Sequence, residues 1–106
     1  MTGLRKRLKD RRPHWLYRFE CDGQSYTGGI GRFEDGGIAE IFINGSKVGT
    51  AAETNAQDAA IVASLALQHG CLLETIRHAL ARSGGHGGPL ATLLAVVEDA
   101  QLPAGL

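Results

Sequence analysis

The sequence predicts an α+β domain in which a three-stranded antiparallel β-meander is followed by three helices packed on it. Apolar and polar residues alternate with a period of two in the first part of the chain, which is typical of half-buried strands. From residue 54 onward the apolar residues recur at helical spacing instead. The chain has 106 residues, which is enough for one domain with a single core.

The first two predicted strands form a hairpin. Asp22-Gly23 separates them and favours a type I′ turn, because both central residues of that turn need positive φ. The returning strand, Gln24–Phe33, contains three glycines that suggest a bulge or a close approach of backbone. The strand before the turn, Trp15–Cys21, alternates, and we expect Trp15 to be its first core residue. Its core-facing residues would be Trp15, Tyr17, Phe19 and Cys21.

A second turn at residues 34–37 leads into the third predicted strand, Ile38–Ile43. Ile38 and Phe42 lie on one face of this strand, and Ala39, Ile41 and Ile43 lie on the other. A strand that is apolar on both faces is usually covered on both. The helices of the same chain can cover one face, so we expect a second copy or a partner on the other. The predicted interface residues of this homodimer are Ile38, Ile41 and Ile43.

The longest predicted helix begins near Thr54 and ends at Gly70. Thr54 and Gln57 match a capping box at its start, and Gly70 suits the left-handed residue that follows a helix. Ile61 and Leu65 lie one turn apart, with Val62 and Ala66 beside them, and several further alanines permit close packing.

Two shorter helices follow. Leu73, Ile76 and Leu80 mark the first, and a Gly-rich linker, Ser83–Gly88, separates it from the second. Pro89 suits the first position of that last helix. Its apolar stripe consists of Leu90, Leu93, Leu94 and Val97. We expect residues 13–100 to form the domain and residues 101–106 to fray.

Charge is segregated along the chain although the net charge is zero. Residues 1–12 carry six basic side chains and one acidic one, whereas residues 13–106 carry five basic and ten acidic ones. We predict a flexible basic arm that can bind nucleic acid, lie on an acidic surface or stay solvated. Trp15 could then stack on a base, although a core role is the simpler one. The basic residues of the arm are Arg5, Lys6, Arg7, Lys9, Arg11 and Arg12.

Composition also predicts where the protein is found. The longest apolar run is too short to cross a membrane, and no apolar stretch follows the charged start as in a signal peptide. The two cysteines do not make a disulfide framework. We therefore expect a cytoplasmic protein with free thiols and no contact with a membrane.

The connection between the third strand and the long helix is a candidate anion site. Lys47, Gly49 and Thr50 precede a helix N-terminus, where free N–H groups and the helix dipole favour an anion such as a nucleotide phosphate. The spacing is not that of a P-loop. The alternative is a tight connection that needs small residues to turn.

Thiol and metal chemistry have weaker support. His69 and Cys71 are close in sequence, but a zinc site needs four ligands and only one such pair is present. The alternative is that Cys71 is a buried apolar residue and His69 caps a helix end. A metal-binding or redox module is thus a third functional class, and we assign no catalytic residue, metal ligand or cofactor.

Several motifs resemble one known family. They are Gly31-Arg32-Phe33-x-Asp35-Gly36, Ala39-Glu40-Ile41-Phe42, Lys47-x-Gly49-Thr50, the run from Asp58 to Gly70, and the run from Leu73 to Leu80. Together they resemble the TSCPD domain, which occurs at the C-terminus of adenosylcobalamin-dependent (class II) ribonucleotide reductases and as short stand-alone proteins. The resemblance extends over about residues 13–99, and the run from Asp58 to Gly70 is its most specific part.

The chain also departs from that family. Where the family has its Thr-Ser-Cys-Pro-Asp motif, this sequence reads Gly87-Gly88-Pro89-Leu90, so the cysteine suspected of binding metal is missing. The catalytic barrel of the reductase, its radical cysteine and its cobalamin site are absent from this sequence as well. The resemblance therefore implies a non-catalytic accessory domain, with a ribonucleotide reductase catalytic chain as its partner.

Overall fold

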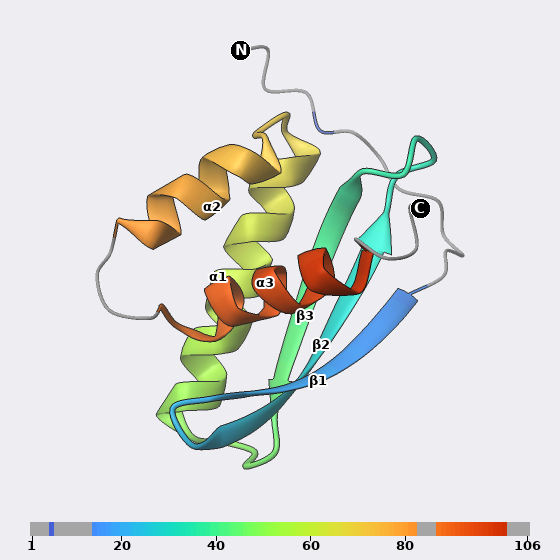
Figure 1. Cartoon of the computed structure of the whole chain (residues 1–106). Helices are drawn as coiled ribbons and strands as arrows, with labels where there is room; N and C mark the ends of the chain where they lie inside the picture. Colours follow the sequence, from blue (N-terminus) through green and yellow to red (C-terminus); the bar gives the residue numbers. More distant parts are fainter. Residues whose placement is uncertain (1–4, 6–13, 83–86, 102–106) are drawn as a thin grey trace.

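The computed structural model, which describes residue 5, residues 14–82 and residues 87–101, shows a three-stranded sheet and three helices (Figure 1). The strands are β1 (His14–Cys21), β2 (Gln24–Arg32) and β3 (Ile38–Gly45), antiparallel and in the order β1-β2-β3. The helices are α1 (Ala51–Gln68), α2 (Leu73–Ala81) and α3 (Pro89–Gln101). The predicted fold class, a meander followed by three helices, is confirmed. The predicted domain limits at residues 12 and 100 stay predictions.

The turns and the irregularity of the sheet follow from its glycines. Asp22 and Gly23 have φ values of 53° and 77°, which confirms the predicted hairpin turn. The pairing of β2 with β3 shifts at Gly31 and Arg32, so that Ala39 has no directly opposite residue. The extra residue of this bulge lies in β3, opposite the end of the Gly-rich strand in which a bulge or a close approach of backbone was expected.

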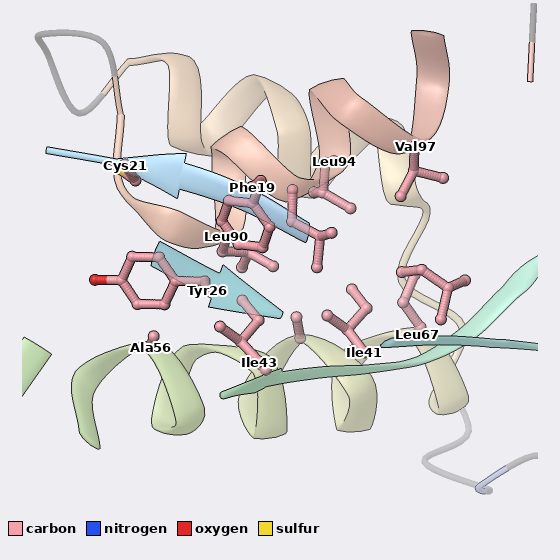
Figure 2. Packing of buried hydrophobic residues seen from close by; sticks show 14 residues of the cluster. Phe19, Cys21, Tyr26, Ile41, Ile43, Ala56, Leu67, Leu90, Leu94 and Val97 are labelled. Carbon is pink, nitrogen blue, oxygen red and sulfur yellow. The ribbon is translucent and has the colours of Figure 1, made fainter. Parts of the chain in front are cut away.

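One face of the sheet, called here the inner face, carries the core. Register places Phe19 opposite Tyr26 and Ile30 opposite Ile41, and both pairs join side chains of α1 and α3 in one buried cluster (Figure 2). A Cβ on Gly28 would lie 2.5 Å from Cδ1 of Leu93, which is fully buried. Glycine at position 28 therefore lets α3 approach the sheet. Among residues 89–98 of α3 the buried side chains are Leu90, Leu93, Leu94 and Val97, which confirms the predicted stripe.

An aromatic pair closes the hairpin end of the core. The rings of Phe19 and Tyr26 stack with centroids 5.4 Å apart and planes 17° apart. Burial raises the pKa of the Tyr26 hydroxyl, and the charges of Cys21 and Asp22 raise it further. The side chains of the hairpin thus favour the neutral phenol.

Two expectations about core and helix boundaries are wrong. Trp15 is 53% exposed, so it lies at the open end of its strand and not in the core. Helix α1 begins at Ala51, and the N-cap is Thr50, whose Oγ1 accepts from the backbone N–H of Glu53. Thr54 lies inside the helix, where its N–H donates to the carbonyl of Thr50. The cap forms earlier because Gly49, at φ 83°, turns the chain just before it.

Helix α1 turns its small residues toward the sheet and its large ones away. Ala56, Ala60 and Ala63 are buried together with Leu67. Ile61, Val62 and Leu65, which the apolar pattern singled out, are exposed. The helix ends at Gln68, and Gly70 has the left-handed conformation expected of it, at φ 96°.

Candidate functional site

The outer face of the sheet, opposite the core, carries an apolar strip across all three strands. Register places Leu16, Gly29 and Phe42 in one row, with glycine in the middle strand. A Cβ on Gly29 would lie 3.4 Å from Leu16 Cδ2 and 3.5 Å from Phe42 Cδ2, so both side chains lean over the glycine. Leu16 is 73% exposed and Phe42 46%. The strip is therefore a surface that water contacts.

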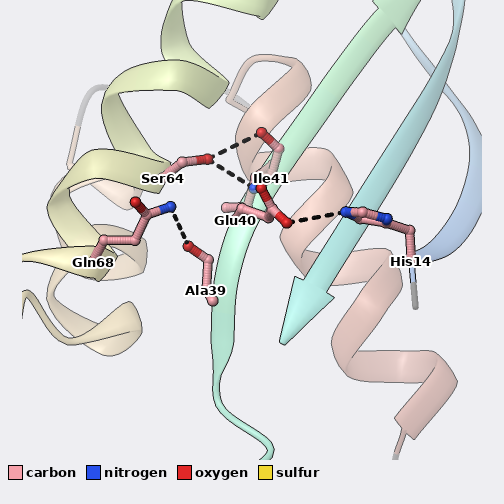
Figure 3. A network of polar contacts seen from close by, with 6 residues as sticks. All are labelled: His14, Ala39, Glu40, Ile41, Ser64 and Gln68. Atoms are coloured by element: carbon pink, nitrogen blue, oxygen red, sulfur yellow. Dashed lines mark hydrogen bonds and ion pairs between the residues drawn. The ribbon is translucent and has the colours of Figure 1, made fainter. Parts of the chain in front are cut away.

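A polar pair lies beside this strip, in the next row of the sheet. Nε2 of His14 and Oε2 of Glu40 are 3.0 Å apart, and Figure 3 shows the histidine reaching over β2 to the carboxylate. A Cβ on Gly31, between them, would lie 2.6 Å from the Glu40 oxygen, so the contact requires glycine there. The His14 ring also meets Phe42 edge to face, with centroids 5.3 Å apart. Apolar and hydrogen-bonding groups side by side are typical of protein interfaces.

The free edge of β3 is closed by polar side chains of α1. Ser64 Oγ accepts from the N–H of Ile41 at 2.8 Å and reaches the Ile41 carbonyl at 3.1 Å (Figure 3). Gln68 Nε2 donates to the carbonyl of Ala39 at 3.1 Å. An edge strand whose backbone groups are bonded in this way does not pair with another strand. Contact with another chain through β3 must then use its outer face.

The predicted interface residues lie on the wrong side of β3 for such a contact. Ile41 and Ile43 are buried in the core of the chain itself, and Ile38 is half-buried and packs against that core. The large apolar side chain that β3 exposes is Phe42. The prediction of a homodimer is not decided by this geometry, but its surface must be sought elsewhere.

The predicted anion site is occupied by a carboxylate of the chain. The side chain of buried Glu53 accepts from the N–H of Gly45 at 3.1 Å and from the N–H of Gly49 at 3.0 Å. Thr50 is the N-cap, and its hydroxyl donates to the carbonyl of Lys47. Glu53 thus takes the position at the helix N-terminus that favours an anion. Binding of an external anion by Lys47, Gly49 and Thr50 stays a prediction, and such an anion would compete with Glu53.

Sequence reasoning missed the residues that organise this end of α1. Thr50-x-x-Glu53 has the spacing of a capping box and lies just before the predicted helix start. This capping box could have been recognised from the sequence. Nothing in the sequence shows that Ser64 and Gln68 reach a strand edge.

Of the predicted basic arm, only Arg5 is among the described residues. Its Nε donates to Oε1 of Gln68 at 2.6 Å, so one buried amide joins Arg5 to β3 through Ala39. The other arm residues, Lys6, Arg7, Lys9, Arg11 and Arg12, lie outside the described residues.

The two cysteines belong to different parts of the fold, and both are free thiols. Cys21 is buried at the end of β1, with its Sγ 3.8 Å from the carbonyl of Gly87. Cys71 follows α1 and is half-buried, whereas a buried residue was one expectation. His69 caps α1, with Nδ1 2.9 Å from the Leu65 carbonyl, as one alternative predicted. Within residues 14–82 and 87–101, no three His, Cys, Asp or Glu side chains gather as a metal site would require. No helix in the same residues is long and apolar enough to cross a bilayer.

Comparison with known proteins identifies the family. The family model of the TSCPD domain matches residues 5–104, which is nearly the whole chain. Searches among curated proteins and among solved structures gave no match. The motifs that pointed to this family lie on β2, β3, α1 and α2 and in the connections that follow β2 and β3. The chain belongs to the TSCPD domain family.

Proposed function

We propose that the protein is a non-catalytic accessory domain that binds a ribonucleotide reductase catalytic chain through the outer face of its sheet. Two things support the proposal. The chain is a TSCPD domain over residues 5–104, and its sequence motifs resemble the C-terminal domain of class II reductases. Its outer face carries the exposed strip of Leu16 and Phe42 beside the His14–Glu40 contact.

Two other surfaces of the sheet are already covered within the chain. Helices α1 and α3 cover the inner face, and Ser64 and Gln68 bond the edge of β3. A partner can still pack against the outer face, where apolar side chains would lose contact with water. Burial of apolar surface contributes about 25 cal/mol per Å² before the costs of association.

The test is a binding titration between the purified protein and the reductase catalytic chain of the same source. Leu16→Glu and Phe42→Thr change exposed positions, and the new side chains suit a strand surface, so the fold should persist. We expect each to weaken binding by about tenfold or more, because apolar residues near the centre of an interface contribute most.

Val48→Asp is the matched control. Val48 is 88% exposed and lies in the connection between β3 and α1, away from the outer face. Its replacement should leave binding unchanged. No binding by the unmodified protein, or equal binding by all three variants, would contradict the proposal.

Nucleic-acid binding is the second candidate, and the charge of residues 1–12 favours it. An arm with six basic side chains would bind phosphates with an affinity that falls steeply with salt. Fluorescence anisotropy with a labelled single strand, with and without residues 1–12, measures this at two salt concentrations. Affinity that is lost with the arm would support this candidate, and equal affinity without it would contradict it.

A further inference from the structure

The outward surface of α1 has the composition of an interface core. Ile61, Val62 and Leu65 are 57%, 67% and 42% exposed. Among the 18 residues of the helix only Glu53 and Asp58 are charged, and Glu53 is buried. The solvent face of a surface helix is normally charged or polar. Depletion of charge around large apolar residues is instead the signature of a buried contact between proteins.

The spacing of this surface matches a helix-pairing seam. Asp58, Val62, Leu65 and His69 follow one another at intervals of four, three and four residues. Alternating intervals of three and four are the a and d positions of a heptad, which keep one stripe facing a second helix. Asp58 to Leu65 lie inside α1, and His69 is its C-cap.

The seam is complementary to itself when two copies run antiparallel. Val62 lies as far before the midpoint of the seam as Leu65 lies after it, and Asp58 and His69 are related in the same way. About a twofold axis at this midpoint, Val62 faces Leu65 of the partner subunit. Asp58 faces His69 of the partner subunit, an acid opposite a base. Each contact occurs twice, as the symmetry of an isologous dimer requires.

The histidine is oriented for this role. Its Nδ1 lies 2.9 Å from the carbonyl of Leu65. A carbonyl only accepts hydrogen bonds, so Nδ1 carries the hydrogen, and Nε2 is left for another group. When the ring is protonated, Nε2–H can donate to a carboxylate, and the pair with the partner's Asp58 is then charged on both sides.

Apolar surface continues on one flank of the seam. Val62 also lines a groove of about 450 Å³ between α1, α2 and α3. Among the lining residues that the structure describes, Asp58 is the one that is charged, and the others include Ala59, Ala66, Ile76 and Leu80. The surface that a second copy would cover is therefore wider than the four seam residues.

We propose that two copies of the chain associate through α1, antiparallel about a twofold axis, with Val62 and Leu65 at the centre and Asp58 paired with His69 at the ends. This dimer leaves the outer face of the sheet free, so it does not rest on the proposed binding of a reductase chain. It replaces the predicted strand interface, whose residues Ile41 and Ile43 are buried in the core.

Sedimentation equilibrium of the full chain over roughly 5–500 μM tests the proposal, because this range detects association with dissociation constants from the micromolar to the sub-millimolar. We expect the average mass to rise toward that of two chains. Val62→Glu and Leu65→Glu should each leave a monomer, with an unchanged circular dichroism spectrum since both positions are exposed. The matched control, Leu16→Glu on the outer face of the sheet, should dimerise as the unmodified chain does.

Charge exchange tests the register. With the histidine protonated, Asp58→Lys opposes two positive charges, and His69→Asp opposes two aspartates, so each alone should weaken association by about tenfold, a typical effect of like charges brought together. The double variant Asp58→Lys, His69→Asp restores opposite charges and should return the affinity to within about threefold of the original. A monomer at every concentration, dimerisation that survives Leu65→Glu, or a double variant as weak as the single ones would overturn the proposal.

Discussion

Helix α1 has small apolar side chains on its core face and large ones on its face toward water, which is the reverse of the usual arrangement. The face against the sheet carries alanines at 56, 60 and 63 with only one large aliphatic residue, Leu67, and the face toward water carries Ile61, Val62 and Leu65. Ser64 explains the inner face, because its hydroxyl can bond the edge of β3 only if the helix lies close to the strand. Small side chains allow that distance. The size of an apolar side chain therefore does not show which face of a helix is the core face.

The largest effect should come from enlarging the inner face. Ala60→Leu adds three carbons at a position that is 2% exposed, and overpacking of this kind costs about 1–3 kcal/mol. It would also push α1 away from the edge of β3. The neighbouring change Ile61→Ala, on the outer face, should cost less than about 0.5 kcal/mol in the monomer.

Urea unfolding at a protein concentration low enough to keep the chain monomeric measures both changes. The contrast between adjacent positions removes helix propensity as the explanation, because alanine and leucine are both good helix formers. Equal free energies of unfolding for the two variants would show that α1 does not pack on the sheet as described.

Much of the fold could be predicted because it depends on local signals. The I′ turn at Asp22-Gly23, the left-handed Gly70 and the first helical residue Pro89 each follow from the φ that one residue type prefers. The position of Trp15 did not follow, because alternation shows which face a side chain is on but not how far the cover on that face extends. Trp15 is on the core side of β1 and still half exposed.

Two adjacent glycines of β2 show the same contrast, because Gly28 is on the covered inner face of the sheet and Gly29 is on the open outer face. A Cβ on Gly28 would lie 2.5 Å from Cδ1 of buried Leu93, whereas a Cβ on Gly29 would make ordinary contacts of 3.4 Å or more. We expect Gly28→Ala to destabilise by about 2 kcal/mol through overpacking. Gly29→Ala should be neutral or stabilise by up to about 0.5–1 kcal/mol, since alanine loses less freedom on folding than glycine.

Thermal unfolding of the two glycine variants, followed by circular dichroism, compares them directly. The double variant Gly28→Ala, Leu93→Val sharpens the comparison, because a shorter side chain at 93 makes room for the new methyl group. It should be more stable than the sum of the two single changes predicts. Strict additivity would mean that the 28–93 contact is not what limits position 28.

The hydrogen bonds of Ser64 account for a smaller effect on the inner face. Ser64→Ala leaves the N–H of Ile41 without its side-chain acceptor, at a cost of about 1 kcal/mol. Hydrogen exchange gives the specific readout, because the amide of Ile41 should exchange faster while that of its neighbour in β2, Ile30, stays protected. Ser64→Thr keeps the hydroxyl and is the control. Unchanged exchange at Ile41 in Ser64→Ala would show that this bond does not protect the edge.

The candidate sites were harder to predict than the fold because they depend on which groups are already used. Lys47, Gly49 and Thr50 have the residue types of an anion site, yet the carboxylate of Glu53 already accepts from the N–H of Gly49 and from that of nearby Gly45. Ile41 and Ile43 have the composition of an interface, yet α1 lies over them. Composition shows what a segment can bind. Only the three-dimensional arrangement shows whether another part of the same chain already covers that segment.

The smallest effect concerns the hydroxyl of Tyr26, whose side chain belongs to the hairpin end of the core. Because burial raises its pKa above the unfolded value of 10.0, the folded state holds this proton more tightly than the unfolded state. The resulting stabilisation is complete below pH 10 and is lost as the pH rises through the folded pKa. Tyr26→Phe removes it, so the difference in stability between the unmodified chain and the variant should be constant from pH 7 to 9. Above pH 10 that difference should shift in favour of the variant. Urea midpoints at pH 8 and 10.5 would measure this shift. A constant difference over the whole range would mean that the pKa of the hydroxyl is the same in the folded and the unfolded chain.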